Sequence, residues 1–208
     1  AESAEKLVGA ESPEPPRLAD GPYAPRDACG DLKGAAEFRQ NLAATIEARD
    51  APGFVALAAE DVKLDFGGGA GTEELMKRLD AEDGQLWRKL DELMTLGCAV
   101  NKQGGLTIPW YFEQPIKGVD PFKGMIVTGE KVPLLAAPDE EAEVLAALSW
   151  DVVEIAALQP DEPFQKVRTR DGVEGYLATG MLRSLIDYRL VASSRNDRWR
   201  IVSLVAGD

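Results

Sequence analysis

Apolar residues in the last eighty-odd positions of the chain occur in short runs separated by turn-forming residues. Such runs lie at 152–155, 175–177 and 199–202. The dipeptides Asp171-Gly172 and Asn196-Asp197 each stand between two runs, where the tight turn of a β-hairpin is expected. The pattern predicts a series of short strands from about residue 125 to residue 208, and such a series is typical of a small β-barrel.

The first half of the chain instead spaces its apolar residues about four apart, which indicates helices. We expect a first helix between residues 29 and 50, ended at 50–53, where a short second helix can start, and a longer helix at 82–96. The apolar positions of the first helix are Phe38, Leu42 and Ile46, and those of the longer helix are Leu86, Leu90, Leu93 and Met94. Residues 62–66 alternate between apolar and polar and predict a strand.

Two proline-rich stretches divide the chain. Residues 1–28 contain five prolines and few large apolar groups, so they cannot form a core alone; they are an irregular tail or, alternatively, a tether. Prolines and glycines at about 114–124 mark a linker. We therefore expect an α+β protein with a small helical domain and a short sheet at 29–114, followed at 125–208 by a barrel and a C-terminal β-hairpin. That hairpin, at about 188–205, could extend the barrel or pair with the first domain.

The composition restricts the possible functions. The 208 residues include 23 Lys plus Arg and 36 Asp plus Glu, a formal net charge of −13. An acidic surface repels phosphates, so nucleic acid is not expected as a partner. The chain has no histidine, which excludes Ser-His and Cys-His catalysis by this chain alone and removes the commonest zinc ligand. We identify no catalytic residue, no metal-ligand set and no cofactor motif.

The chain has two cysteines, Cys29 and Cys98, whose oxidation state would indicate the cellular compartment of the protein. A disulfide between them would enclose about seventy residues and join the two ends of the helical region. The alternative is a pair of buried thiols in a cytoplasmic protein. No apolar stretch approaches the roughly 20 residues that span a bilayer. The chain begins at Ala rather than Met, which favours an exported protein whose signal has been removed. We expect a periplasmic or secreted protein, with the cytoplasm as the alternative.

Glycines at 67–71 lie between a predicted strand and a predicted helix, where phosphate-binding loops occur. Their spacing fits neither common phosphate-loop motif, and Glu73 and Glu74 would repel a phosphate at the helix start. Asp61, Asp65 and the acidic cluster at 80–83 could serve acid–base hydrolysis. In a chain this acidic, neighbouring carboxylates are expected by chance, and we interpret them as solvated surface.

Residues 125–187 show an ordered set of short motifs. These are Val132-Pro133-Leu134-Leu135 near the start, Leu148 to Ile155, Phe164-Gln165-Lys166-Val167, Gly172-Val173-Glu174-Gly175-Tyr176-Leu177, and Met181-Leu182 at the end. Their order and spacing resemble bacterial Src-homology-three (SH-three-like) domains. The resemblance implies a five- to six-stranded barrel that acts as an accessory module, associated in exported bacterial proteins with cell-wall peptides or protein partners.

The candidate ligand-binding residues are aromatic: Trp150, Tyr176, Phe164, Trp110 and Tyr111. Phe164 and Tyr176 stand where the family has tryptophans, and Trp150 where it usually has glycine. The eukaryotic relatives bind proline-rich ligands in aromatic-lined grooves, and the loss of the usual aromatics puts that binding mode in doubt here. Trp110 and Tyr111 belong to the aromatic run 110–112, which either packs in the core or forms a ligand platform.

The N-terminal part has a second resemblance. The predicted elements include a helix that ends at Arg49-Asp50, a short second helix, a strand, and a terminal strand at 199–202. This combination is similar to nuclear-transport-factor-two-like proteins, which have a cone-shaped α+β fold. Most of the strands that would form such a cone are missing before residue 115.

Together these features predict a non-catalytic binding or accessory protein of the bacterial envelope that recognises a peptide, a cell-wall fragment or a protein partner. The alternative is a small-molecule binder or a carboxylate-based hydrolase with a pocket between the two parts. A deep cavity with a desolvated carboxylate would favour the alternative, whereas a shallow aromatic groove without a buried acid would favour the first. The sequence does not determine the oligomeric state.

Overall fold

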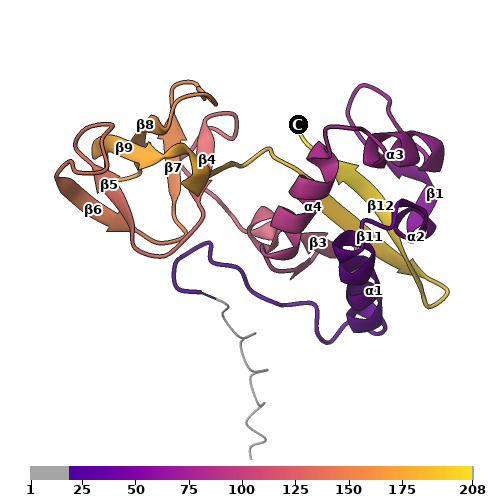
Figure 1. Ribbon diagram of the computed structural model, residues 1–208. Coiled ribbons are helices and arrows are strands. Elements are labelled where there is room, and N and C mark those ends of the chain that lie inside the picture. The colour runs from indigo at the N-terminus through magenta and orange to yellow at the C-terminus, as the bar shows by residue number, and fades with distance from the viewer. Residues whose placement is uncertain (1–18, 208) are drawn as a thin grey trace, which may run out of the picture.

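The computed structural model describes residues 19–207, which form helices and two β-sheets (Figure 1). The mixed α+β class expected from the sequence is therefore confirmed. Residues 1–18, the larger part of the proline-rich segment, lie outside the described residues. Within residues 19–207, no helix has the length and apolar character that crossing a bilayer requires.

The first sheet has five strands in the order β1-β12-β11-β3-β2. Their bounds are β1 Ala58–Lys63, β2 Ala99–Val100, β3 Leu106–Ile108, β11 Arg189–Arg195 and β12 Arg198–Val205. β11 and β12 form the hairpin predicted around Asn196-Asp197, and both turn residues have positive φ. β12 runs parallel to β1, and β11 runs antiparallel to β3. The final hairpin therefore completes the first sheet, and the unit expected at 125–208 is divided between the two sheets.

Four helices accompany the first sheet: α1 Ala35–Glu47, α2 Ala51–Ala56, α3 Thr72–Leu79 and α4 Gln85–Met94. The predicted apolar positions of α1 and α4 are buried, except that Met94 is only partly so. The Asp50 carboxylate caps α2 by accepting a hydrogen bond from the Gly53 amide at 3.0 Å. Figure 1 shows α1 and α4 over β11 and β12, and Phe38 of α1 stacks on Trp199 of β12 with ring centroids 5.9 Å apart. The core of the first part lies between these helices and the sheet.

The second sheet has seven strands in the order β10-β4-β7-β8-β9-β5-β6. Their bounds are β4 Gly124–Val127, β5 Val132–Leu135, β6 Val144–Leu148, β7 Val152–Ile155, β8 Phe164–Thr169, β9 Glu174–Ala178 and β10 Leu182–Ser184. The β8–β9 hairpin turns at Asp171-Gly172, as predicted. A small core of its own lies on one face, built from Met125, Val127, Val132, Leu134, Val153, Ile155, Val167 and Leu177.

The predicted SH-three-like barrel is wrong, because this sheet is open. A closed barrel has no edges, since its first and last strands hydrogen-bond to each other. Here β10 and β6 stand at opposite ends of the strand order and do not pair. The resemblance over residues 125–187 is corrected accordingly. Alternating apolar residues occur in the strands of open and closed sheets alike, so the pattern could not distinguish the two.

The aromatic run at 110–112 also differs from the sequence-based picture of a strand. β3 ends at Ile108, and Trp110–Glu113 form the 3₁₀ helix η1. A 3₁₀ turn places three successive side chains in three directions. Trp110 and Tyr111 are buried, and Phe112 is exposed. The run therefore provides both a core contact and a surface ring at the point where the chain leaves the first sheet.

Candidate binding pocket between the two sheets

A pocket of about 280 Å³ lies where the chain passes between the two sheets. It is formed by η1, by the linker that leads to β4, by the segment that returns from β10 to β11, and by the C-terminal end. The lining residues are Tyr111, Phe112, Gln114, Ile116, Pro121, Leu185, Ile186, Arg189 and Gly207. Apolar and aromatic side chains dominate this lining, and we call it the junction pocket.

Among residues 19–207, the only charged residue in the lining of the junction pocket is Arg189, at the start of β11. Its guanidinium lies 4.5 Å from the ring centroid of Phe112 and 5.5 Å from that of Phe66. Nη1 also donates a hydrogen bond to the Gly207 carbonyl at 2.8 Å. Lys63 Nζ lies 4.0 Å from the Phe66 ring centroid. The aromatic rings attract these two cations by cation–π interaction.

Tyr111, which lines the junction pocket, also contacts a cluster of charged side chains around Arg183. Its hydroxyl accepts a hydrogen bond from Arg183 Nε at 3.0 Å. Burial raises the pKa of the Tyr111 hydroxyl, and the neighbouring Arg183 opposes that effect only in part. The phenol is therefore neutral at physiological pH and serves as a fixed hydrogen-bonding group rather than as a base.

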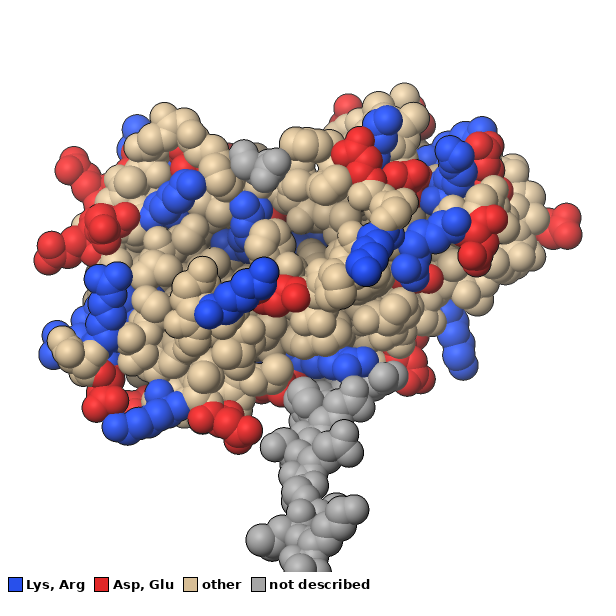
Figure 2. Space-filling view, turned by 180° about the vertical axis from the view of Figure 1, so that it is seen from behind, with Lys and Arg blue, Asp and Glu red and all other residues tan. Residues whose placement is uncertain are grey.

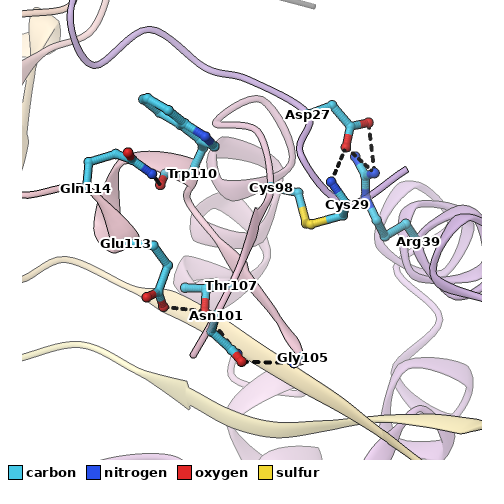
Figure 3. Close-up of a disulfide and its surroundings, with 10 residues drawn as sticks. All are labelled: Asp27, Cys29, Arg39, Cys98, Asn101, Gly105, Thr107, Trp110, Glu113 and Gln114. Atoms are coloured by element: carbon cyan, nitrogen blue, oxygen red, sulfur yellow. Dashed lines mark hydrogen bonds and ion pairs between the residues drawn. A yellow bond between two sulfur atoms is a disulfide. The ribbon is translucent and has the colours of Figure 1, made fainter. Parts of the chain in front are cut away.

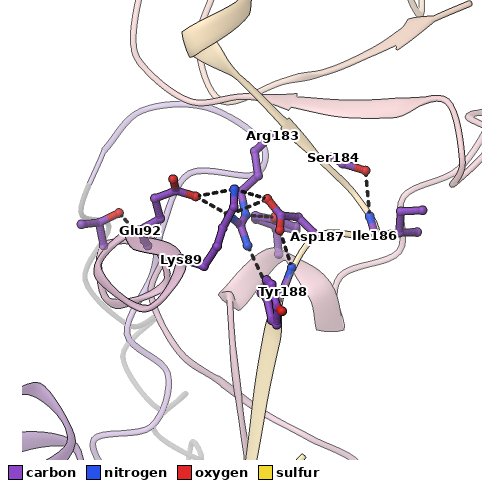
Figure 4. Close-up of polar contacts among 9 residues, drawn as sticks. Lys89, Glu92, Arg183, Ser184, Ile186, Asp187 and Tyr188 are labelled. Carbon is purple, nitrogen blue, oxygen red and sulfur yellow. Dashed lines mark hydrogen bonds and ion pairs between the residues drawn. The ribbon is translucent and has the colours of Figure 1, made fainter. Parts of the chain in front are cut away.

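Arg183 of β10 holds the cluster together, and its side chain is 5% exposed. It donates to the Tyr188 carbonyl at 2.7 Å and forms ion pairs with Glu92 at 3.0 Å and Asp187 at 3.1 Å. Lys89 pairs with the same Asp187 at 2.9 Å. Figure 4 shows Lys89 and Glu92 of α4 facing the β10 side of the cluster. These contacts join α4 of the first part to the second sheet.

Within the described part of the chain, no carboxylate lines the junction pocket. Asp187, the more buried acid of the cluster, is bonded to two cations, Arg183 and Lys89. Asp187 is thus held within the cluster and is not part of the described pocket lining. That lining offers apolar, aromatic and cationic contacts to a ligand.

The structure places the five predicted ligand residues in several different environments. Tyr111 lines the junction pocket, and Trp110 is buried beneath the Arg26 guanidinium, 4.8 Å from its ring centroid. The half-buried Trp150 packs against the main core, and its carbonyl accepts from the Tyr23 amide. Phe164 and Tyr176 lie half-buried on the adjacent strands β8 and β9. A role in ligand binding for any of them remains a prediction.

Phe112 belongs to the run 110–112 that was expected to pack in the core or form a ligand platform, but it was not among the five candidate residues, and Arg189 was not predicted at all. Phe112 carried a weak signal as the third residue of the aromatic run. Arg189 carried none, because an arginine at the start of a strand is common on protein surfaces. Its position depends on Phe66 and Phe112, which are far from it in the sequence.

Cys29 and Cys98 form a disulfide, which confirms the predicted bond (Figure 3). Both cysteines are buried and their Cα atoms are 5.8 Å apart. Asp27 forms a β-bridge with Cys98, and its carboxylate accepts from the Cys29 amide and pairs with Arg39 at 2.8 Å. The bond ties the segment before α1 to the residue that directly precedes β2. An intramolecular disulfide indicates an oxidising, non-cytoplasmic environment.

The glycine-rich loop at 67–71 uses its amides internally. Asp65 accepts hydrogen bonds from the Gly67 amide at 2.8 Å and the Gly69 amide at 2.7 Å, and it also pairs with Arg78. The Arg78 bond, followed by that from Gly69, lowers the pKa of Asp65 to about 2. A carboxylate of the chain therefore occupies the place of an external anion. Across residues 19–207, no group of three or more acidic or cysteine side chains is arranged to hold a metal ion.

Charges of both signs are mixed on the molecular surface. Figure 2 shows Lys and Arg interspersed with Asp and Glu over one face, and the described residues on that face form no broad basic area. A nucleic-acid backbone needs such an area. The face therefore gives no support to a nucleic-acid partner.

No protein-family model and no curated protein matches the chain. Similar solved structures include a protein of unknown function with a cystatin-like fold from Nostoc punctiforme, 10% identical, covering 86% of this chain and 92% of that one, with a TM-score of 0.27. Another is a domain of unknown function with a cystatin-like fold from the same organism, 10% identical, covering 84% and 76%, with a TM-score of 0.26. Their descriptions do not name an SH-three-like fold. At TM-scores this low, neither likeness carries an argument about function.

Proposed function

We propose that the protein is a non-catalytic binding protein of the cell envelope or the extracellular space. In this proposal the junction pocket holds one end of a peptide or cell-wall fragment. The observation that carries the proposal is the lining of the pocket, which among residues 19–207 combines apolar and aromatic side chains with one guanidinium and no carboxylate. The disulfide supports the location, because such bonds persist in oxidising compartments.

The chemistry of the lining selects a class of ligand. Phe112, Ile116 and Leu185 offer apolar contacts, and the Gln114 side chain carries an amide. Arg189 contributes a guanidinium, a group that suits carboxylates, and a ligand carboxylate would share it with the contacts that Arg189 already makes. A peptide end that combines an apolar side chain with a free carboxylate matches this set. Such ends occur both in proteins and in wall peptides, so the two sources share one recognition chemistry.

The alternative of a carboxylate-based hydrolase lacks support. Such an enzyme needs a carboxyl group with a raised pKa in contact with the substrate. Among residues 19–207, no acid lines the junction pocket, and Asp187 in the neighbouring cluster is bonded to Arg183 and Lys89.

Calorimetric titration of the intact chain with matched ligands tests the proposal. N-acetyl-alanyl-leucine with a free carboxylate is compared with the same dipeptide as its amide, and a wall-derived peptide with a free carboxylate forms a third arm. We expect the amide to bind at least about tenfold more weakly than the acid, since it loses a charge-assisted contact. Equal binding of acid and amide, or binding of neither acid, would contradict the proposal.

Two variants connect the result to the pocket. Phe112→Ala removes an exposed ring from the pocket, and Arg168→Ala truncates an exposed arginine on β8 as the control. The first is expected to weaken binding and the second is not. A thiol titration of protein from its native source, under denaturing and non-reducing conditions, tests the location. Two free thiols would argue against export.

A further inference from the structure

Strand β6 forms an edge of the second sheet (Figure 1). Its inner side pairs with β5, from Val132 opposite Leu148 to Leu135 opposite Val144. Among residues 19–207, no strand pairs with its outer side. An edge of this kind presents unpaired backbone groups to which another extended chain can bind.

The register identifies which backbone groups of β6 point outward. Ala147 is opposite Pro133. Proline has no N–H, so this cannot be a pair in which both residues exchange hydrogen bonds. In the other kind of antiparallel pair, the N–H and C=O of both residues point away from each other. Ala147 therefore directs its donor and its acceptor toward the open side of the sheet.

The side chains of β6 are apolar and exposed, which is unusual at a sheet edge. Val144 is 57% exposed and Leu145 is 43% exposed. Natural proteins protect edges with lysine, proline, bulges or a covering segment. β6 contains neither lysine nor proline. Its one irregularity is the register shift opposite Leu134 and Leu135, near its beginning.

A second cavity lies beside this edge. It measures about 280 Å³ and is lined by Ala146, Leu148, Asp151, Thr169, Arg170, Asp171 and Val173. Arg170 and Asp151 pair with each other at 2.7 Å, while Ala146, Leu148 and Val173 are apolar. Ala146 and Leu148 lie on the face of β6 that packs against the small core. A strand added to β6 would place every second side chain on this face, next to the cavity.

The charge next to β6 specifies the partner further. The loop before β6 carries Asp139, Glu140, Glu141 and Glu143, all exposed. None of these four takes part in an ion pair within the described part of the chain. No lysine or arginine occurs between residues 132 and 149. The N-terminal end of β6 therefore lies next to a group of exposed carboxylates that form no ion pair within the described part of the chain. Such a group complements a basic side chain of a partner.

We propose that β6 is a docking edge for an extended peptide that adds to the sheet antiparallel to it. The peptide carries small apolar side chains at alternate positions, which lie against Ala146 and Leu148. A lysine or arginine follows at its carboxyl end, next to Glu141 and Glu143. Antiparallel addition places this basic end at the beginning of β6. The edge is separate from the junction pocket, so this inference does not depend on the proposed function.

Fluorescence anisotropy on the intact chain tests the proposal with a labelled peptide, fluorescein-Thr-Val-Thr-Val-Thr-Lys-Lys-amide. The amide end removes the free carboxylate that the junction pocket is proposed to hold, so the two proposals can fail separately. We expect saturable binding that weakens as salt is added. A peptide ending in Glu-Glu is expected to bind at least about tenfold more weakly, because like charges meet at the edge.

The variants test the backbone of the edge. Ala147→Pro removes the outward N–H without removing a bond to β5, and it is expected to weaken binding at least about tenfold. Ala147→Val keeps the N–H and is expected to bind within about twofold of the unchanged chain. Leu145→Lys, which repels the basic peptide, is a second variant should Ala147→Pro fail to fold. Unchanged binding by a folded Ala147→Pro chain would overturn the proposal.

Two other occupants of the edge would also overturn it. A dimer seen by analytical ultracentrifugation, and abolished by Ala147→Pro, would show that a second copy covers β6. A chain without residues 1–18 that binds the peptide much more tightly than the intact chain would show that the protein's own first residues cover it. Equal binding of the Lys-Lys and Glu-Glu peptides would show that the acidic loop does not select a basic peptide end, which contradicts the proposal.

Discussion

Replacing Arg183 by methionine is expected to destabilise the protein strongly, because this side chain joins the two sheets. Methionine keeps much of the aliphatic volume and removes the guanidinium. The Tyr111 hydroxyl and the Tyr188 carbonyl each lose a hydrogen-bond donor at 3.0 Å and 2.7 Å. Leaving such groups unsatisfied costs about 1–3 kcal/mol each when they are buried, and less where water can reach them.

The charged partners of Arg183 contribute unequally. Glu92 is 50% exposed, so losing its ion pair costs at most about 1 kcal/mol. Asp187 is mostly buried but keeps Lys89 at 2.9 Å, so its loss is smaller than the roughly 3–5 kcal/mol of a buried charge left alone. We therefore expect Arg183→Met to lower the free energy of unfolding by about 3–5 kcal/mol in total.

Urea denaturation followed by tryptophan fluorescence and far-ultraviolet circular dichroism measures this loss. For a chain of this size, it corresponds to a fall in Tm of about 6–20 °C. Arg168→Met is the control, because Arg168 is exposed on β8 and the same substitution there should change stability by less than about 0.5 kcal/mol. If Arg183→Met costs no more than Arg168→Met, the cluster does not stabilise the junction and the reasoning is refuted.

Other predictions follow from individual contacts. Replacing Cys29 and Cys98 by alanine should cost up to about 4 kcal/mol in urea denaturation, because the bond closes a long loop. The pKa of Asp65 is lowered from 3.8 to about 2, so its ionised carboxylate stabilises the folded protein above pH 3.8 and this contribution is lost as the pH falls toward 2. Arg78→Gln should raise the pKa of Asp65, which carboxyl NMR measures. Gly97→Ala should lower Tm by several degrees, because φ is +74° there and a Cβ would lie 2.3 Å from a backbone oxygen.

Local patterns in the sequence were enough to predict the helices and the turns. The stripes at Phe38, Leu42 and Ile46 in α1 and at Leu86, Leu90 and Leu93 in α4 are buried as expected. The hairpins at Asp171-Gly172 and Asn196-Asp197 are also present. These features depend on residues within a few positions of each other, and helical period and turn chemistry act over that range.

The pairing of strands could not be predicted in this way. β1 and β12 lie side by side although about 140 residues separate Ala58 from Ile201. Whether the strands at 124–184 close into a barrel depends on whether β10 meets β6, and neither strand carries a signal for the other. The expected barrel was wrong for that reason, and so was the grouping of the final hairpin with it.

Composition alone excluded histidine chemistry and made nucleic acid an unfavourable partner, and the two cysteines indicated a disulfide. Only the tertiary structure brought Arg189 between Phe66 and Phe112, placed Arg183 against Tyr111, and left β6 at an edge beside its acidic loop. Each of these arrangements joins residues distant in the sequence. Side-chain identity sets what such groups can bind, while long-range packing decides which of them meet.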